Sequence, residues 1–211
     1  MPGLEILGDV SDDGERIVLV NRPEIRSPGD LWLVTSIGDP AVRLSETDAS
    51  EVSPTWSPET DRIAYARSLG DREWSFEIRA VVGGAARVFY RSRSLDRPCL
   101  DWSPDGRSIA LSVRPHDDGL SDVLIYRLET GQIDDSTATP GKDFFRPAWS
   151  PDGQSLAVIH RWSAVSLDLF VFDFDEGGAL RRVTNDRSRI ADVDWTPDGR
   201  RLVFAGERLG A

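Results

Sequence analysis

The sequence predicts an all-β fold built from a repeated unit of four antiparallel strands, and three observations support this prediction. The first is a repeated turn, which reads SPDG at 103–106 and 150–153 and TPDG at 196–199. The second is a tryptophan directly before each of these turns. The third is an alternating apolar run directly after each turn, such as SIALSV at 108–113. Four antiparallel strands repeating every 40 to 50 residues or so form one blade of a β-propeller.

The apolar residue that opens the strand after each turn defines the period. It recurs at intervals of 46, 46, 47 and 46 positions, at Ile17, Ile63, Ile109, Leu156 and Leu202. The tryptophan keeps the same period in the last four copies, while Val10 takes its place in the first; the four are Trp56, Trp102, Trp149 and Trp195. We therefore assign four of the seven tryptophans to the cores between blades.

Each copy begins with a short strand that ends at the tryptophan, and the turn then closes a hairpin. In the turn at 103–106, proline suits the second position of a type I turn, and glycine suits the fourth, where the chain leaves with positive φ. The first two copies depart from this pattern. SDDG has Asp12 in place of proline, and SPET ends in Thr60 instead of glycine. These departures leave the tightness of the first two hairpins open, but not the fold.

The third strand of each copy follows a variable loop, and a glycine turn then leads to a fourth strand such as GAARVFYR. The expected third strands are LWLVT at 31–35, FEIRAV at 76–81, VLIYRL at 123–128 and LDLFVFDF at 167–174. We expect a single domain over 1–211, with blades at about 4–46, 50–93, 97–139, 144–185 and 190–211. The last blade is incomplete, so the prediction is a partial propeller of four complete blades plus half a blade. Its open blade edges would allow a homo-oligomer.

The repeat resembles a known family. The pattern WSPDG, an apolar strand, a strand such as DLFVFDF, a Gly pair and RRVT is similar to the TolB-like, WD-repeat-like β-propeller repeat over nearly the whole chain. The order of these segments also resembles the propeller modules attached to winged-helix regulators or serine/threonine kinases in bacteria. That resemblance implies a sensing or interaction module joined to an output domain.

Composition narrows the classes of partner. With 39% hydrophobic and 29% charged residues, the chain suits a soluble globular body or repeat array. A net charge of −11 disfavours binding to the phosphate backbone of nucleic acid. No apolar run is long enough to predict membrane insertion. Lone Cys99 leaves the compartment open: periplasmic if a membrane-spanning regulator is attached, otherwise cytoplasmic. Nearly all cations are arginine, which fits either salt adaptation or GC-rich coding.

Because the sequence lacks the common catalytic and metal-binding motifs, we predict no enzyme, no metal and no cofactor. The sequence contains no Gly-x-Ser-x-Gly elbow, no His-Glu-x-x-His pair and no Cys-x-x-Cys pair. His116 and His160 fall in expected loops of different repeats and lack spaced partners, so we interpret both as solvated. DFDEGG at 173–178 imitates the start of a calcium loop, but Thr184 stands where the bidentate glutamate is needed.

One group of residues predicts a binding face. The loops between second and third strands emerge at one face of a propeller, and here they begin with or contain arginine. Two of them also carry a tryptophan outside the repeat, and arginine with tryptophan is typical of binding hot spots. We expect the candidates to be largely exposed and to suit an acidic or phosphorylated protein or peptide: Arg22, Arg67, Trp74, Arg114, His116, His160, Arg161 and Trp162. The alternative is that each arginine pairs with an acid of its own blade.

Three functions follow from these observations. The first is a non-catalytic interaction or ligand-sensing module, part of a larger bacterial regulatory protein. The second is the gating propeller of a prolyl-oligopeptidase-like serine peptidase, which a Gly-x-Ser-x-Gly segment elsewhere in the gene would reveal. The third is a propeller that is itself an enzyme, such as a lactonase or glycosidase, and nothing in the sequence requires it.

Overall fold

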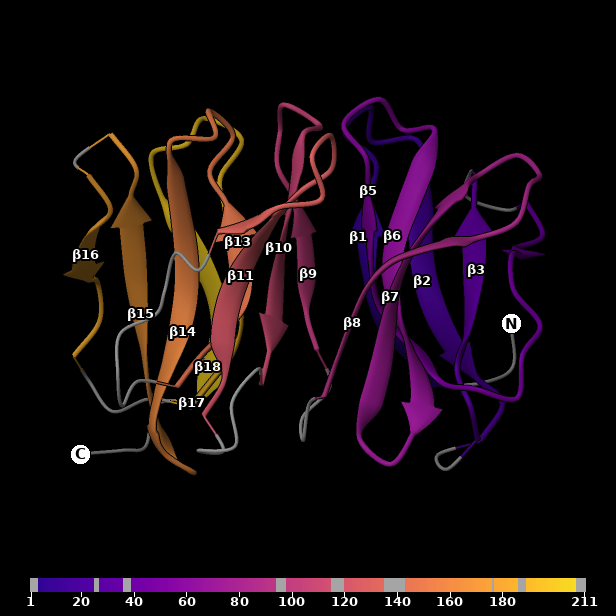
Figure 1. The fold of residues 1–211 in the computed structure, drawn as a ribbon, viewed down its shortest axis with the longest axis horizontal. Coiled ribbons are helices and arrows are strands. Elements are labelled where there is room, and N and C mark those ends of the chain that lie inside the picture. Colours follow the sequence, from indigo (N-terminus) through magenta and orange to yellow (C-terminus); the bar gives the residue numbers. More distant parts are fainter. Residues whose placement is uncertain are drawn as a thin grey trace. The chain divides into compact units, whose positions relative to one another are not determined.

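The structure is a computed structural model, and within the residues it describes the chain forms strands and no helix, as predicted (Figure 1). The described residues are 4–24, 27–35, 39–93, 98–114, 120–134, 143–175, 177–185 and 189–207. The chain divides into two compact units, Met1–Trp102 and Ser103–Ala211. Each unit is described by itself below.

The first unit contains two four-stranded antiparallel sheets, each in simple up-and-down order. The first sheet consists of β1 (Leu4–Val10), β2 (Ile17–Arg22), β3 (Asp30–Val34) and β4 (Val42–Arg43). The second consists of β5 (Glu51–Trp56), β6 (Arg62–Gly70), β7 (Glu73–Ala80) and β8 (Arg87–Arg93). The unit ends with β9 (Leu100–Trp102).

The second unit continues the same pattern. The third sheet has the order β12-β11-β10-β9, with β10 (Ser108–Val113), β11 (Asp122–Arg127) and β12 (Ile133–Asp134). The fourth consists of β13 (Phe144–Trp149), β14 (Ser155–Ser163), β15 (Ser166–Asp173) and β16 (Ala179–Arg182). Among the described residues a fifth sheet has two strands, β17 (Arg189–Trp195) and β18 (Leu202–Glu207). Four four-stranded sheets and a two-stranded one match the predicted partial propeller.

All five hairpin turns are closed in the same way, including the two that depart from the SPDG pattern. In the second copy the N–H of Thr60 donates to the carbonyl of Ser57 at 2.8 Å, and in the third the N–H of Gly106 donates to Ser103 at 2.9 Å. Thr60 adopts a φ of 56°, so it occupies the left-handed region that glycine occupies in the other four turns. The first two hairpins are therefore as tight as the rest, and Thr60 bears the strain.

The alternation of apolar residues explains how neighbouring sheets pack. In the fourth sheet, Leu156 and Phe172 belong to a buried cluster with Ala110 and Val123 of the third sheet. Their neighbours in sequence, such as Ala157 and Val171, belong to another cluster with residues of the fifth sheet. Because successive side chains of a strand point to opposite faces, one sheet contributes to two cores. In the first unit, residues of the first and second sheets share a core in the same manner.

Within each unit, a tryptophan of the repeat joins one sheet to the preceding one. Trp56 is 4% exposed, and its indole Nε1–H donates to the carbonyl of Asp9 at 3.1 Å. Trp195 makes the equivalent bond to the carbonyl of Ala148 at 3.0 Å. Both bonds reach back 47 residues, to the residue before the tryptophan position of the preceding copy. Trp56 and Trp102 are buried, and Trp149 and Trp195 are partly buried against the core clusters of the second unit, as their spacing predicts.

Candidate functional site

Arg22 does not lie on an exposed face, contrary to the expectation from sequence. It is the last residue of β2 and only 7% exposed. The chain returns over it at Gly29, where an added Cβ would stand 3.2 Å from the Arg22 Nε. This close approach buries the guanidinium, so Arg22 is a structural residue of the first sheet.

Trp74, His160 and Trp162 lie on strands rather than in the loops that the sequence suggested. Ser68 pairs with Trp74, and β6 and β7 continue to a two-residue turn at Asp71 and Arg72. Both turn residues have positive φ, 46° and 66°, as a type I′ hairpin turn requires. The β14–β15 hairpin is extended in the same way. Pairing the backbone groups of these segments explains why strands replace the predicted loops.

His160 is buried, and its interpretation as a solvated loop histidine was wrong. It is 2% exposed within β14, with its ring in edge contact with Phe144 at 4.9 Å between centroids. His116 lies outside the described residues.

Arg67 belongs to a buried network of the second sheet. Its Nη2 is 3.0 Å from Glu51 Oε1 and 3.2 Å from Glu77 Oε2, and both acids are almost inaccessible. The Tyr65 hydroxyl donates to Glu77 at 2.9 Å, and the Ser45 hydroxyl donates to Glu51. Arg67 therefore compensates two buried carboxylates of its own sheet, which is the structural alternative set out above.

Burial dominates the electrostatics of this network. Desolvation raises the pKa of the Glu51 carboxyl, and the hydrogen bonds from Ser45 and Arg67 only partly offset it. Desolvation and the nearby Glu77 charge also raise the pKa of the Tyr65 hydroxyl. Burial is thus the main cause of both shifts, and in Glu51 the bonds from Ser45 and Arg67 act against it.

Arg161 and Arg114 are partly exposed. The Nε of Arg161 is 3.5 Å from Asp143 Oδ2, and its guanidinium lies 4.8 Å from the ring centroid of Phe145. The Nε of Arg114 donates to the hydroxyl of Ser121 at 3.3 Å. Arg161 thus also pairs with an acid of its own sheet, and about a quarter of its side chain, 28%, reaches solvent.

Trp162 is the sequence candidate that the structure leaves most accessible, at 52% exposed. Its Nε1–H donates to Asp168 Oδ2 at 2.6 Å, and the Arg182 guanidinium lies 5.5 Å from its ring centroid. Asp168 is fully buried and also accepts from Arg182 at 2.5 Å. The His160 and Trp162 rings are in edge contact, with their centroids 4.2 Å apart. These contacts hold an exposed indole in one orientation.

The sequence reasoning missed the acids that hold this end of the sheets. Glu51 is the first residue of β5, and Asp143 directly precedes β13, one position earlier in the register. Asp30, Asp122 and Asp168 recur near the start of the third strand. An acid repeated at one register position was the signal that could have revealed the arginine partners.

Among the described residues no three His, Cys, Asp or Glu side chains are placed to hold a metal ion. The same part of the chain contains no helix long and apolar enough to cross a membrane.

The repeated sheets, the turn motif and the inter-sheet tryptophans define a β-propeller protein. The sequence model of the TolB beta propeller domain matches residues 97–211, more than half of the chain. The chain therefore belongs to the TolB β-propeller family.

Individual relatives agree with this assignment. An uncharacterized peptidase, YuxL of Bacillus subtilis, is 22% identical over 198 residues, covering 74% of this chain and 29% of that protein. Dipeptidyl-peptidase 5 of Porphyromonas gingivalis is 30% identical over 121 residues, covering 50% of this chain and 17% of that protein. The chain spans less than a third of the length of either relative.

A solved structure shows the same fold. TolB from Acinetobacter baumannii superimposes with a TM-score of 0.82 over 95% of this chain and 48% of the TolB chain. Only 14% of the residues are identical, so this likeness concerns the fold.

Proposed function

We propose that the chain is a non-catalytic interaction or ligand-sensing propeller, a module of a larger bacterial regulatory protein that binds a protein or peptide. The single observation that carries the proposal is Trp162, a half-exposed tryptophan held by Asp168 and Arg182. Large aromatic side chains that are already ordered bind a partner at a low cost in conformational entropy.

The surroundings of Trp162 suit a partner with acidic groups. Arg161 follows the buried His160 on the same strand and keeps a quarter of its side chain accessible. Arg182, which is 38% exposed, lies against the Trp162 ring. Guanidinium groups bind carboxylates and phosphates in two-pronged geometry, so an acidic or phosphorylated segment is the partner that this end of the fourth sheet favours. Self-association through blade edges stays a separate prediction.

Selection of peptides tests the proposal without a known partner. A phage-displayed library of random peptides is selected against the full chain, and the recovered peptides are measured against variants. We expect enrichment in Asp and Glu and at least a tenfold loss of affinity in Trp162→Ala. Val82→Ala is the control, because Val82 is 92% exposed and lies outside this group. Peptides that bind Trp162→Ala as well as the parent would refute recognition at Trp162.

The second candidate is the propeller domain of a serine peptidase. It is favoured by the likeness to YuxL and dipeptidyl-peptidase 5, whose names record peptidases. Under this proposal the chain guides or admits peptides, while a separate hydrolase domain cleaves them. Sequencing the complete open reading frame tests it. A Gly-x-Ser-x-Gly segment outside these residues supports the peptidase, and a winged-helix or kinase domain supports the regulator.

A further inference from the structure

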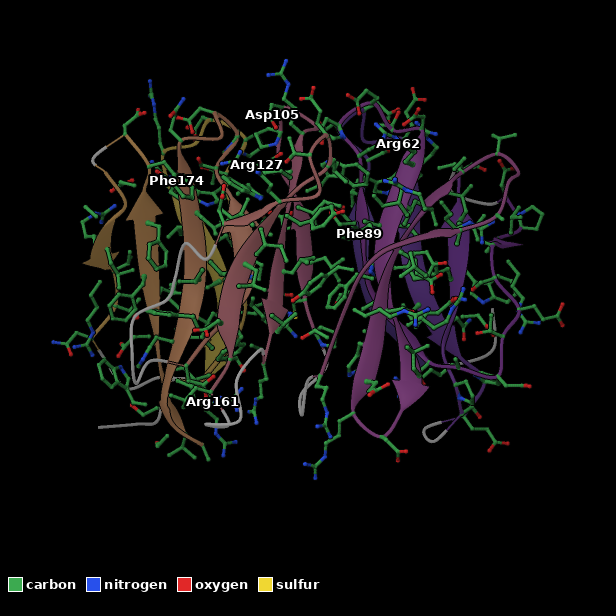
Figure 2. All side chains as sticks on the ribbon, in the orientation of Figure 1. Arg62, Phe89, Asp105, Arg127, Arg161 and Phe174 are labelled. Carbon is green, nitrogen blue, oxygen red and sulfur yellow. The ribbon has the colours of Figure 1, made fainter. Side chains whose placement is uncertain are left out.

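The second unit contains an open pocket at the hairpin-turn end of its sheets, away from Trp162. Its volume is about 410 Å³. Figure 2 shows Asp105 and Arg127 at this upper end of the unit and Arg161 at the lower end. The pocket is lined by two turns and the strands beside them: Ser103, Pro104, Asp105, Ser108, Arg127, Trp149, Pro151, Asp152, Gly153 and Gln154.

The equivalent positions in the earlier copies of the repeat indicate which chemical group this pocket can hold. In the first unit, the residue before the period-defining Ile places its guanidinium over the tryptophan of the next copy. Arg16 lies 5.0 Å from the ring centroid of Trp56, and Arg62 lies 5.3 Å from that of Trp102. The same position in the third copy is Ser108, whose short side chain lines the pocket with Trp149. A serine thus stands where two earlier copies supply an arginine.

We propose that this pocket binds a guanidinium group, supplied by an arginine side chain of a peptide or protein partner. The site is separate from Trp162 and does not depend on recognition there. A guanidinium stacks on an aromatic face and donates in the plane to carboxylates, whereas the compact ammonium of lysine does neither as well.

Two carboxylates of the lining supply the complementary charge. Asp105 Oδ1 accepts from the Ser103 hydroxyl at 2.6 Å and from the Arg107 N–H at 3.0 Å. Asp152 Oδ1 accepts the equivalent bonds from Ser150 and Gln154. In both acids these bonds fall on Oδ1, and the second oxygen Oδ2 is the acceptor offered to a ligand.

The cation of the lining, Arg127, does not oppose this assignment. Its Nε pairs with Asp134 Oδ2 at 2.9 Å, and its Nη1 donates to the Ser108 hydroxyl at 3.2 Å. Arg127 thus pairs with Asp134 and also interacts electrostatically with Asp105. With Asp105 and Asp152 against Arg127, the lining of the pocket is net negative by one charge.

The aromatic wall is held in place before any ligand arrives. Phe174 stacks on Trp149 with centroids 5.4 Å apart and an interplanar angle of 30°. The two turns are also in contact, since a Cβ added to Gly153 would lie 3.4 Å from Pro104 Cγ. A pre-formed wall of this kind reduces the entropy lost when a ligand is ordered.

Titration calorimetry of the full chain with N-acetyl-L-arginine amide tests the proposal. We expect saturable binding below about 10 mM, and at least fivefold weaker binding of N-acetyl-L-lysine amide. An arginine-centred tripeptide amide should bind more tightly than the single amino-acid amide if the source is a peptide. Equal affinity would assign the site to small free guanidinium compounds and overturn the peptide source.

Variants locate the binding. Ser108→Arg restores the side chain of the earlier copies, so it should reduce affinity at least tenfold while raising the melting temperature. Asp152→Asn should weaken binding severalfold. Asp198→Asn is the matched control, because Asp198 makes the same turn bonds with Thr196 and Arg200 but does not line the pocket. The proposal is overturned if the parent shows no saturable binding, if Ser108→Arg binds like the parent, or if the two Asp variants weaken binding equally.

Discussion

The two ends of each sheet are built differently, although aspartate and arginine are frequent at both. At the hairpin-turn end, the turn acid of four copies is held by a hydroxyl two residues earlier, as in Ser150–Asp152 and Thr196–Asp198, both at 2.6 Å. In the second copy the Ser57 hydroxyl bonds to Asp61 instead, at 3.1 Å. At the opposite end, acids are buried and pair with residues distant in sequence, as Glu51 does with Arg67 at 3.0 Å. The first arrangement repeats in four of the five copies, whereas the second recurs only in part: Arg43–Asp30 and Arg182–Asp168 are equivalent pairs, but Arg67–Glu51 joins different positions.

The pKa values of the acids also differ between the two ends of the sheets. The hydroxyl hydrogen bond lowers the pKa of the turn carboxyls Asp13, Asp152 and Asp198, which remain near solvent. Burial raises the pKa of Glu51. Local turn bonds therefore define the repeat at little desolvation cost, while the other end depends on charge pairs that fail if one partner is lost. Variation between copies is greater at that second end, where recognition by Trp162 is proposed.

The largest effect is expected from the tryptophan beside the hairpin-turn end. Trp56→Ala removes a buried ring, its bond to the Asp9 carbonyl and the stacking of Arg16. We expect the free energy of unfolding to fall by about 3–5 kcal/mol, measured by urea denaturation. Trp162→Ala at the opposite end should cost less than about 1 kcal/mol, because half of that ring is already exposed. Similar losses in both variants would contradict the assignment of core and surface tryptophans.

Removing one partner of the buried charge network should have the next largest effect. Arg67→Met leaves Glu51 and Glu77 buried without a cation, and we expect a loss of about 2–3 kcal/mol. This is below the usual cost of a fully buried pair, because a quarter of the Arg67 side chain is exposed. The double variant Arg67→Met/Glu51→Gln should recover part of the loss. Arg127→Met, which breaks an exposed pair with Asp134, should change stability by less than about 1 kcal/mol.

Acid should weaken the hairpin-turn end first. The turn carboxyls have folded pKa values below the unfolded value of 3.8, so their contribution is complete above that pH. It is lost as the pH falls through the lower, folded values. We expect Asp13→Asn, Asp152→Asn and Asp198→Asn combined to flatten the acid limb of a melting-temperature profile. A parent and variant with parallel profiles below pH 4 or so would refute this source of stability.

The contribution of Glu51 to stability should depend on pH in the opposite direction. Its folded pKa lies above the unfolded value of 4.5, so the folded state binds more protons and stability declines as the pH rises through that window. The Glu51→Gln variant should therefore lose the declining limb that starts near pH 4.5, as measured by thermal melting.

The smallest effect is expected at the strained turn. Thr60→Gly places glycine in the left-handed conformation that the other four turns assign to it. Relief of strain should stabilise the chain by less than about 1 kcal/mol, because the hydrogen bond from Arg16 to the Thr60 hydroxyl is lost. Gly106→Thr is the reverse change and should destabilise the third hairpin. A Thr60→Gly chain that melts lower than the parent would show that the Arg16 bond outweighs the strain.

Elements that carry the repeat could be predicted from the sequence, and elements outside it could not. The run FEIRAV at 76–81 lies almost wholly within β7, because alternation and the turn motif agree there. The turn at Asp71 and Arg72 was not predicted, because neither residue type by itself indicates the positive φ that both adopt. The partner of Arg67 depends on strand register, which joins residues 16 apart in sequence. The sequence shows that Ser108 stands where the preceding copy has Arg62. The contact of Arg62 with a tryptophan, which gives this change its significance, is seen only in the structure.

The hydrogen bonds from Trp56 and Trp195 to the preceding sheet also constrain the order in which the chain folds. A hairpin joins residues close in sequence, whereas Trp56 and Asp9 are 47 residues apart. Closing a long loop costs more chain entropy and is slower, so individual hairpins should form before neighbouring sheets dock. During that interval the apolar faces of a single sheet are uncovered. Refolding yield should therefore fall with protein concentration, and variants of the docking tryptophans should shift the slow phase rather than the early one.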